Sequence, residues 1–326
     1  MPEPSLPSKR RGRLFRFGAS LVVLLAVAGY LVVQYVTGGR SGPGCLVVSG
    51  KGDGATYEFT PEQAVNAATI TAVGTARDLP ERAVTIALAT ALQESALRNI
   101  DYGDRDSLGL FQQRPSQGWG TPKEIMDPAY AAEKFYEHLE EVPGYTRLPL
   151  TVAAQKVQRS GFPQAYAKHE PDAALLAAAL TGRSAATLTC EGRPAATRAA
   201  GADAVRAALV RDFGRDLLEP AGAEVGDAAA SPSARAEAGS DGSDGSDGRT
   251  VTLPVAGGEG ADAGARGWQL AHWAVANASA LHIKHVSYAG REWTAGNTDS
   301  QWRSTDGKGS ADAGDGAGAV RITTTR

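Results

Sequence analysis

Glu94 is the residue whose type and surroundings most directly suggest chemistry. It lies near the end of a segment of small and aliphatic residues, and the positions one turn earlier, Thr90 and Ala91, offer no basic partner. Burial against apolar groups disfavours the anion and therefore raises the pKa of a carboxyl. A glutamic acid still protonated near neutral pH can donate a proton to a leaving oxygen and take one back, as glycosidic bond cleavage requires. On these grounds alone, an exposed glutamate at a helix end is the more common alternative.

A second segment lies at a fixed distance from Glu94 and forms a motif together with it. Ser95 follows directly, and the sequence Ser-Leu-Gly-Leu-Phe-Gln-Gln occupies 107–113, with Gly109 fifteen residues after Glu94. This pair of segments resembles the catalytic core of soluble lytic transglycosylases and of the wider lysozyme-like superfamily, with a phenylalanine in place of a methionine. The stretch 89–166 is similar to bacterial cell-envelope proteins that carry such a domain.

The resemblance implies roles for individual residues. Glu94 matches the general acid/base of the family, and Gln112 matches its glutamine in the cleft. The third motif of the family, Ala-Tyr-Asn-Ala-Gly, falls on 157–161 with only its glycine kept. Gln158 then stands where the family has a tyrosine that helps to hold the catalytic carboxyl. Tyr166 could substitute for that tyrosine from nearby.

The predicted substrate-binding residues combine aromatic side chains for stacking on sugar faces with amides for hydroxyl and acetamide groups. Burial in the core is an equally good expectation for the aromatic residues, and Gly109 would let the backbone approach the sugar. The domain holds more acids than bases, so we expect binding through stacking and hydrogen bonds rather than through attraction of anionic wall polymers. The predicted set is Ser95, Ser107, Gly109, Phe111, Gln112, Gln113, Trp119, Gln158 and Tyr166, with Tyr102 and Gln117 as further candidates.

The substrate implied by the resemblance is the peptidoglycan glycan strand, cut between N-acetylmuramic acid and N-acetylglucosamine. A lytic transglycosylase needs no second carboxylate, because the 6-hydroxyl of the muramoyl residue attacks and leaves a 1,6-anhydro end. A hydrolase needs a second carboxylate, about 5 Å away if retaining and about 6.5–9.5 Å away if inverting. Asp101, Asp104 and Asp106 are candidates, although binding of loop N–H groups or of Arg105 is the more common role. Both reactions stay open, and the family favours transglycosylation.

The sequence predicts neither a cofactor nor a metal site. His282 and His285, together with His272, lack a third ligand at a recognisable spacing, so we interpret them as ordinary side chains. Cys45 and Cys190 are too few for a four-cysteine zinc site. In an oxidising compartment we expect these two cysteines to form a disulfide, with two unpaired thiols as the alternative.

The elements expected to position these residues are helices, and we predict a mainly α lysozyme-like domain over 45–190. Thr60-Pro61-Glu62-Gln63 is a capping signature for a helix that runs to about Arg77. Pro80-Glu81 opens a second helix, which ends at Ser95. The polar segment 99–121 is typical of a long, functional loop. Further helices are expected from Asp127-Pro128 onward, over 151–160 with Thr151 as its cap, and over 171–180.

The N-terminal part of the 326-residue chain differs from the rest in charge. Residues 1–16 form a basic tail, and 17–36 are uncharged and long enough to cross a hydrocarbon core. We therefore predict a single-pass signal anchor in the cell membrane, with the tail cytoplasmic and the bulk extracytoplasmic. A cleaved signal peptide with an Ala-x-Ala site at 26–28 is the alternative. The whole chain has 33 basic and 36 acidic residues, which argues against a general nucleic-acid binder.

Residues 199–326 are predicted to form a small α/β module whose protein partner the sequence does not identify. Four tryptophans in it fit either a docking surface or an aromatic core. The low-complexity segments 221–249 and 304–318 are expected to be disordered insertions. We expect helices near 203–217 and 267–281, and strands near 250–255, 283–288, 292–294 and 320–324.

Together these features predict a membrane-anchored envelope enzyme that cleaves peptidoglycan with one acid/base residue, Glu94. The alternative is a non-catalytic peptidoglycan-binding or scaffold protein that keeps the fold, because the third motif is altered.

Overall fold

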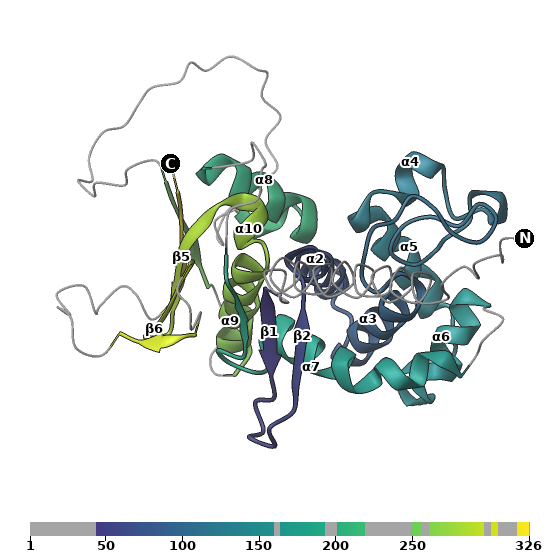
Figure 1. Cartoon of the computed structure of the whole chain (residues 1–326), viewed down its shortest axis with the longest axis horizontal. Coiled ribbons are helices and arrows are strands. Elements are labelled where there is room, and N and C mark those ends of the chain that lie inside the picture. The colour runs from purple at the N-terminus through teal and green to yellow at the C-terminus, as the bar shows by residue number, and fades with distance from the viewer. Residues whose placement is uncertain are drawn as a thin grey trace, which may run out of the picture. The chain divides into compact units, whose positions relative to one another are not determined.

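The chain forms two compact units in its computed structural model, Met1–Gly42 and Pro43–Arg326. The described residues all lie in the second unit and comprise 44–159, 164–192, 201–218, 249–255, 261–296, 301–305 and 318–325 (Figure 1). Among them, no helix is both long and apolar enough to cross a membrane. The structure thus shows no transmembrane helix, and the segment 17–36, on which we predicted one, lies outside the described residues.

Two helices form the centre of the unit, and both were predicted. α2 (Pro61–Ala76) begins with the expected capping box, in which Thr60 Oγ1 accepts from the Gln63 N–H and Gln63 Oε1 accepts from the Thr60 N–H. α3 (Glu81–Ser95) is buried along most of its length. Its apolar surroundings explain why a sequence of small and aliphatic residues forms this helix. The burial fixes the position of its last turn, which carries Glu94.

Three further helices surround α3, in the order expected. α5 (Pro128–Glu140) is capped by Asp127, and α7 (Glu170–Leu180) packs along α3. α6 (Leu150–Gln158) differs from the prediction at its start, because Pro149 holds the cap position and Thr151 lies inside the helix. Short helices α4 (Pro122–Ile125), η1 (Pro115–Gln117), η2 (Tyr145–Arg147) and η3 (Ala165–His169) complete this region.

The expectation of a mainly α domain over 45–190 is wrong. β1 (Cys45–Val48) pairs antiparallel with β2 (Thr56–Phe59) on one side and with β3 (Leu188–Cys190) on the other. These strands have only three or four residues each, too few for an alternating pattern to show, and β3 comes from the far end of the domain. Cys45 lies opposite Cys190 in the sheet, and the two form the predicted disulfide.

A second antiparallel sheet contains β4 (Thr250–Pro254), β5 (Ile283–Tyr288), β6 (Arg291–Thr294), β7 (Arg303–Ser304) and β8 (Ala319–Thr324), in the order β4-β8-β5-β6-β7. Its alternating burial agrees with the predicted strands, although the two-residue β7 was missed. α8 (Ala202–Phe213), η4 (Arg215–Leu218), α9 (Ala261–Ala276) and α10 (Ala278–Leu281) accompany this sheet, and α9 packs on it (Figure 1). Most of 221–249 and 304–318 lies outside the described residues.

The C-terminal region is part of the same compact unit, which corrects the prediction of a separate small module following the first domain. Buried Asp212 accepts hydrogen bonds from Trp273 Nε1 and from Thr69 Oγ1 of α2. The indole N–H groups of Trp302 and Trp293 donate to carbonyl oxygens of β3. These tryptophans are therefore core residues rather than a docking surface.

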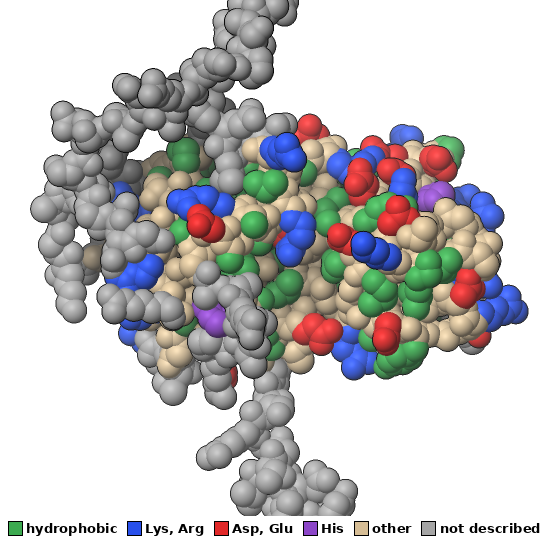
Figure 2. Space-filling view, turned by 90° about the horizontal axis from the view of Figure 1, so that it is seen from above, with side chains coloured by type: hydrophobic (Ala, Val, Ile, Leu, Met, Phe, Trp, Pro, Cys, Tyr) green, Lys and Arg blue, Asp and Glu red, His purple; other side chains and the backbone are tan. Residues whose placement is uncertain are grey.

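Acidic and basic side chains are interspersed over the described surface that Figure 2 displays. A surface with mixed charges produces little net field at a distance, since neighbouring contributions cancel. Recognition of a charged ligand would therefore depend on charges gathered within one site.

Candidate active site

Glu94 occupies the last turn of α3 and is held by a residue far away in sequence. Its Oε1 atom accepts a hydrogen bond from Tyr166 Oη at 2.6 Å. Tyr166 is fully buried and belongs to η3, which packs against α3. Tyr166, which we predicted could hold the carboxyl from nearby, thus contacts Glu94 directly.

Burial raises the pKa of the Glu94 carboxyl, and hydrogen bonds from Tyr166 and Gln158 partly oppose this effect. The direction is the one expected from the apolar sequence around Glu94. The physical cause is desolvation of the anion, as no basic group contributes to the shift. Such a carboxyl can hold a proton at a higher pH than an exposed glutamate does.

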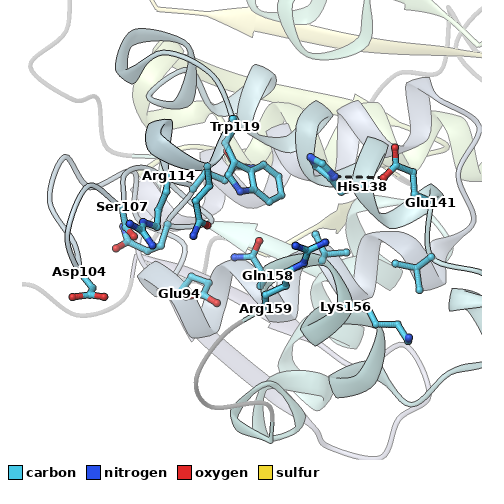
Figure 3. A pocket seen from close by; sticks show the side chains of 16 residues that line it. Glu94, Asp104, Ser107, Arg114, Trp119, His138, Glu141, Lys156, Gln158 and Arg159 are labelled. Atoms are coloured by element: carbon cyan, nitrogen blue, oxygen red, sulfur yellow. Dashed lines mark ion pairs between the residues drawn. The ribbon is translucent and has the colours of Figure 1, made fainter.

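The Glu94 side chain lines a groove with a volume of about 950 Å³ (Figure 3). In the close view, Trp119 and His138 lie across the groove from Glu94, Gln158 and Arg159. The groove is lined by the last turn of α3, the loop before α4, the end of α5 and the end of α6. The lining residues are Glu94, Asp104, Ser107, Gln112, Gln113, Arg114, Gln117, Gly118, Trp119, His138, Glu141, Val142, Lys156, Val157, Gln158 and Arg159.

The loop between α3 and α4 is fixed by hydrogen bonds within its backbone and by hydrogen bonds from side chains to backbone carbonyl groups. Leu108 and Gln113 form an antiparallel bridge with N–O distances of 2.9 and 3.0 Å. Ser95 Oγ donates to the Leu110 carbonyl at 2.8 Å, and Gln113 Nε2 donates to the Ala131 carbonyl at 3.0 Å. The buried Ser95 therefore joins α3 to the loop and is not among the groove-lining residues. Ser107 and Gln113, although mostly buried, do line the groove.

Besides Ser95 and Tyr166, two further predicted binding residues do not line the groove. The Phe111 side chain is fully buried and stacks on Phe135 with ring centroids 4.6 Å apart, so it cannot stack on a sugar. Gly109 adopts φ +75°, and a Cβ atom there would lie 2.7 Å from the Ile125 carbonyl oxygen. Glycine is needed at this position because the loop backbone passes close to Ile125.

Three more predicted binding residues line the groove, in addition to Ser107 and Gln113. Gln112, Trp119 and Gln158 line it, and Gln158 Nε2 also donates to the Phe111 carbonyl at 2.6 Å. The Trp119 ring is half-buried, with its centroid 4.3 Å from that of His138. Tyr102 is 63% exposed and is not among the lining residues. Gln158 thus lines the groove together with Glu94.

The three loop acids have different surroundings. Asp106 accepts from Arg114 Nε and from the Ser116 N–H, both at 2.8 Å. Hydrogen bonding from the Ser116 side chain, from Arg114 and from the Ser116 backbone holds the pKa of the Asp106 carboxyl well below its usual range. It therefore fixes the loop, with Arg114 rather than Arg105 as its partner. Asp104 lines the groove and is exposed, whereas Asp101 is exposed and does not line it.

Sequence reasoning missed five charged or titratable groups that line the groove, namely Arg114, His138, Glu141, Lys156 and Arg159. His138 and Glu141 lie one turn apart, with their N and O atoms 3.7 Å apart. Lys156 and Arg159 lie at the end of α6, directly around the altered third motif. The closeness of these basic residues to Gln158 in sequence was the signal that could have found them.

The histidines considered as metal ligands have other partners. His272 is fully buried between the Ala179 carbonyl and the Thr187 N–H, and burial lowers its pKa to about 4. His285 contacts Glu292 at 3.2 Å. Within the described ranges, no group of three or more His, Cys, Asp and Glu side chains is placed to hold a metal ion.

Comparison with known proteins concerns the C-terminal region alone. A family model described as VldE, C-terminal domain, matches residues 220–315, which is less than half of the chain and includes none of the groove-lining residues. Among curated proteins, none matches the sequence.

Proposed function

We propose that this protein cleaves the glycosidic bond between N-acetylmuramic acid and N-acetylglucosamine in peptidoglycan, with Glu94 as general acid and base. The observation that carries the proposal is the Glu94 carboxyl at the groove, half-buried and held at 2.6 Å by Tyr166. The motif resemblance around Glu94 and 107–113 supplies the substrate class.

The proposed reaction needs one proton to move twice. Because Oε1 accepts from Tyr166, the proton to be donated resides on Oε2. Glu94 gives this proton to the bridging oxygen as the bond from the muramoyl C1 to that oxygen breaks. The resulting carboxylate then takes a proton from the attacking hydroxyl, which restores the acid.

Within this proposal, transglycosylation is the preferred outcome. A retaining hydrolase needs a second carboxylate free to act near the reacting carbon. Asp106 is already bound by Arg114 and Ser116 and does not line the groove. Besides Glu94, the carboxylates among the groove-lining residues are Asp104 and Glu141. The 6-hydroxyl of the muramoyl residue needs no such partner, and its attack would leave a 1,6-anhydro end.

The alternative is a non-catalytic glycan-binding protein. It is favoured by Gln158, since an amide stands where the family has a tyrosine and contacts both Glu94 and the Phe111 carbonyl. The same groove would then hold a glycan strand without cleaving it. The Cys45–Cys190 disulfide fits both proposals, because disulfides persist in oxidising, extracytoplasmic compartments.

One experiment separates these proposals. The purified full chain and its Glu94→Gln variant are incubated with peptidoglycan, and the products are analysed by mass. Anhydro-muropeptides that disappear in the variant support the transglycosylase, and hydrated reducing ends would select the hydrolase. Equal binding of strands by both proteins, without released products, would favour the non-catalytic protein.

A further inference from the structure

The groove contains basic side chains that no described acidic group neutralises. Of the three cations that line it, Arg114 is bound to Asp106 at 2.8 Å. The side chains of Lys156 and Arg159 form no hydrogen bond or ion pair with the residues that the structure describes. Both are exposed, and both remain able to bind an anion.

Arg159 lies on the same side of the groove as the reacting carboxyl (Figure 3). Glu94, Gln158 and Arg159 all line the groove, and Arg159 follows Gln158 as the residue that ends α6, with φ +52°. In Figure 3 the Arg159 side chain points into the groove, whereas the Lys156 side chain points away from its centre. Arg159 is therefore the principal cation beside Glu94.

The acidic side chains of the groove leave this position open to an anion. In the same view, Asp104 and Glu141 lie at opposite ends, with Glu94 and Arg159 between them. An anionic group entering the groove would be repelled from both ends, since like charges at short range disfavour each other. The guanidinium of Arg159 offers paired donors suited to a carboxylate.

We propose that Arg159, with Lys156 beside it, forms a subsite that binds a carboxylate of the glycan substrate next to the bond cleaved at Glu94. This inference rests on the proposed function and adds a preference for glycan strands that carry a carboxylate over neutral strands. Muramic acid carries a lactyl ether with a carboxyl group, whereas a polymer of N-acetylglucosamine carries none. In peptide-bearing strands the lactyl carboxyl is part of an amide bond, and the free carboxylates belong to the peptide.

Binding measured in the Glu94→Gln chain tests the subsite without cleavage. Three soluble oligomers of equal length serve as probes in calorimetry: peptide-free muramic acid strands, peptide-bearing strands, and neutral N-acetylglucosamine oligomers. We expect at least one anionic probe to bind about tenfold more tightly than the neutral probe, which corresponds to one charge-assisted pair. This preference should weaken as salt is added.

Variants of Arg159 identify the group responsible. Arg159→Gln should reduce the preference to within about twofold, and Arg159→Lys should retain part of it, because the charge is kept without the paired donors. Arg147→Gln is the matched control, since Arg147 is exposed and does not line the groove. It should leave the preference intact.

The outcomes separate this inference from the proposed function. Equal affinity for anionic and neutral probes, or a preference that survives Arg159→Gln, would overturn the subsite. The stronger of the two anionic probes identifies the carboxylate as lactyl or peptide. If the wild-type chain cleaves peptidoglycan but shows no preference for anionic probes, only the subsite proposal is contradicted. If it shows the preference but does not cleave, only the proposed activity is contradicted.

Discussion

Tyr166 and Glu94 are 72 residues apart in the chain, yet the Tyr166 hydroxyl donates to Glu94 Oε1 at 2.6 Å. The contact joins η3 to the last turn of α3 and leaves the second carboxyl oxygen of Glu94 for the groove. Because the tyrosine is fully buried, the hydrogen bond fixes the position of the carboxyl, and it lowers the pKa of the carboxyl against the larger effect of burial.

Removing the Tyr166 hydroxyl should change the pH dependence of cleavage. The hydrogen bond from Tyr166 lowers the Glu94 pKa against the larger effect of burial, so Tyr166→Phe should raise that pKa further. Activity needs the protonated acid, and the limb at which activity falls with rising pH should therefore move to higher pH. We also expect kcat/KM to fall about tenfold through lost positioning. A pH profile unchanged by Tyr166→Phe would contradict this role.

The difference in stability between wild type and the Glu94→Gln variant should depend on pH in a defined direction. Folding raises the Glu94 pKa above the 4.5 of an unperturbed glutamate, so the folded state binds the proton more tightly than the unfolded state. Wild-type stability is then lost as pH rises from 4.5 through the folded pKa. Each pKa unit of difference corresponds to about 1.4 kcal/mol before screening by solvent reduces it.

Thermal unfolding measured across this pH range checks the prediction. Glu94→Gln should unfold at a higher temperature than wild type near neutral pH, and the difference should disappear in acid. Glu58→Gln, at an exposed position of β2, serves as a control. A constant difference between Glu94→Gln and wild type at every pH would show that burial of the charge is not its cause.

Asp212 should be essential to the stability of the whole unit. Its side chain is fully buried and accepts from Trp273 Nε1 at 2.8 Å, Thr69 Oγ1 at 3.3 Å and Arg211 Nε at 2.7 Å. Asp212→Ala leaves these donors unpaired and should cost about 3 kcal/mol in urea unfolding. Asp203→Ala, at an exposed position of α8, should change stability by less than about 0.5 kcal/mol. Comparable losses in the two variants would argue against a joint core.

The disulfide between Cys45 and Cys190 should stabilise the unit by reducing the conformational entropy of the unfolded chain. It closes a loop across a sequence separation of 145 residues, for which loss of the bond costs about 2–5 kcal/mol. The double variant Cys45→Ala/Cys190→Ala should therefore unfold at lower urea concentration than the oxidised wild type. Reduced wild type should resemble the double variant, and a reduced chain as stable as the oxidised one would refute the prediction.

The helices and the second sheet were predictable because their signals are local. Thr60 and Asp127 cap helices through side chains next to the backbone groups that they satisfy. In β8, buried residues alternate with half-buried ones over six positions, and the second half of β5 alternates in the same way. Such patterns need no knowledge of distant contacts.

The first sheet and parts of the candidate site depend on distant contacts, and this is why they were missed. β3 exists only because its three residues pair with β1. Phe111 has the residue type expected of a sugar-stacking group, but its ring packs on Phe135 from α5. The excess of acids over bases in the domain did not reveal the cations at the end of α6, because overall charge does not determine the charges around one groove.

In the proposed reaction, the protonated Glu94 carboxyl breaks a glycosidic bond. The most direct measurement counts new glycan chain ends released from peptidoglycan by the wild-type chain, by Glu94→Gln and by the Glu58→Gln control, with anhydro and hydrated ends resolved by mass. We expect new ends, mainly anhydro, from wild type and the control, and at least about a hundredfold fewer new ends from Glu94→Gln. Equal release by all three proteins, or no release by any of them, would contradict it.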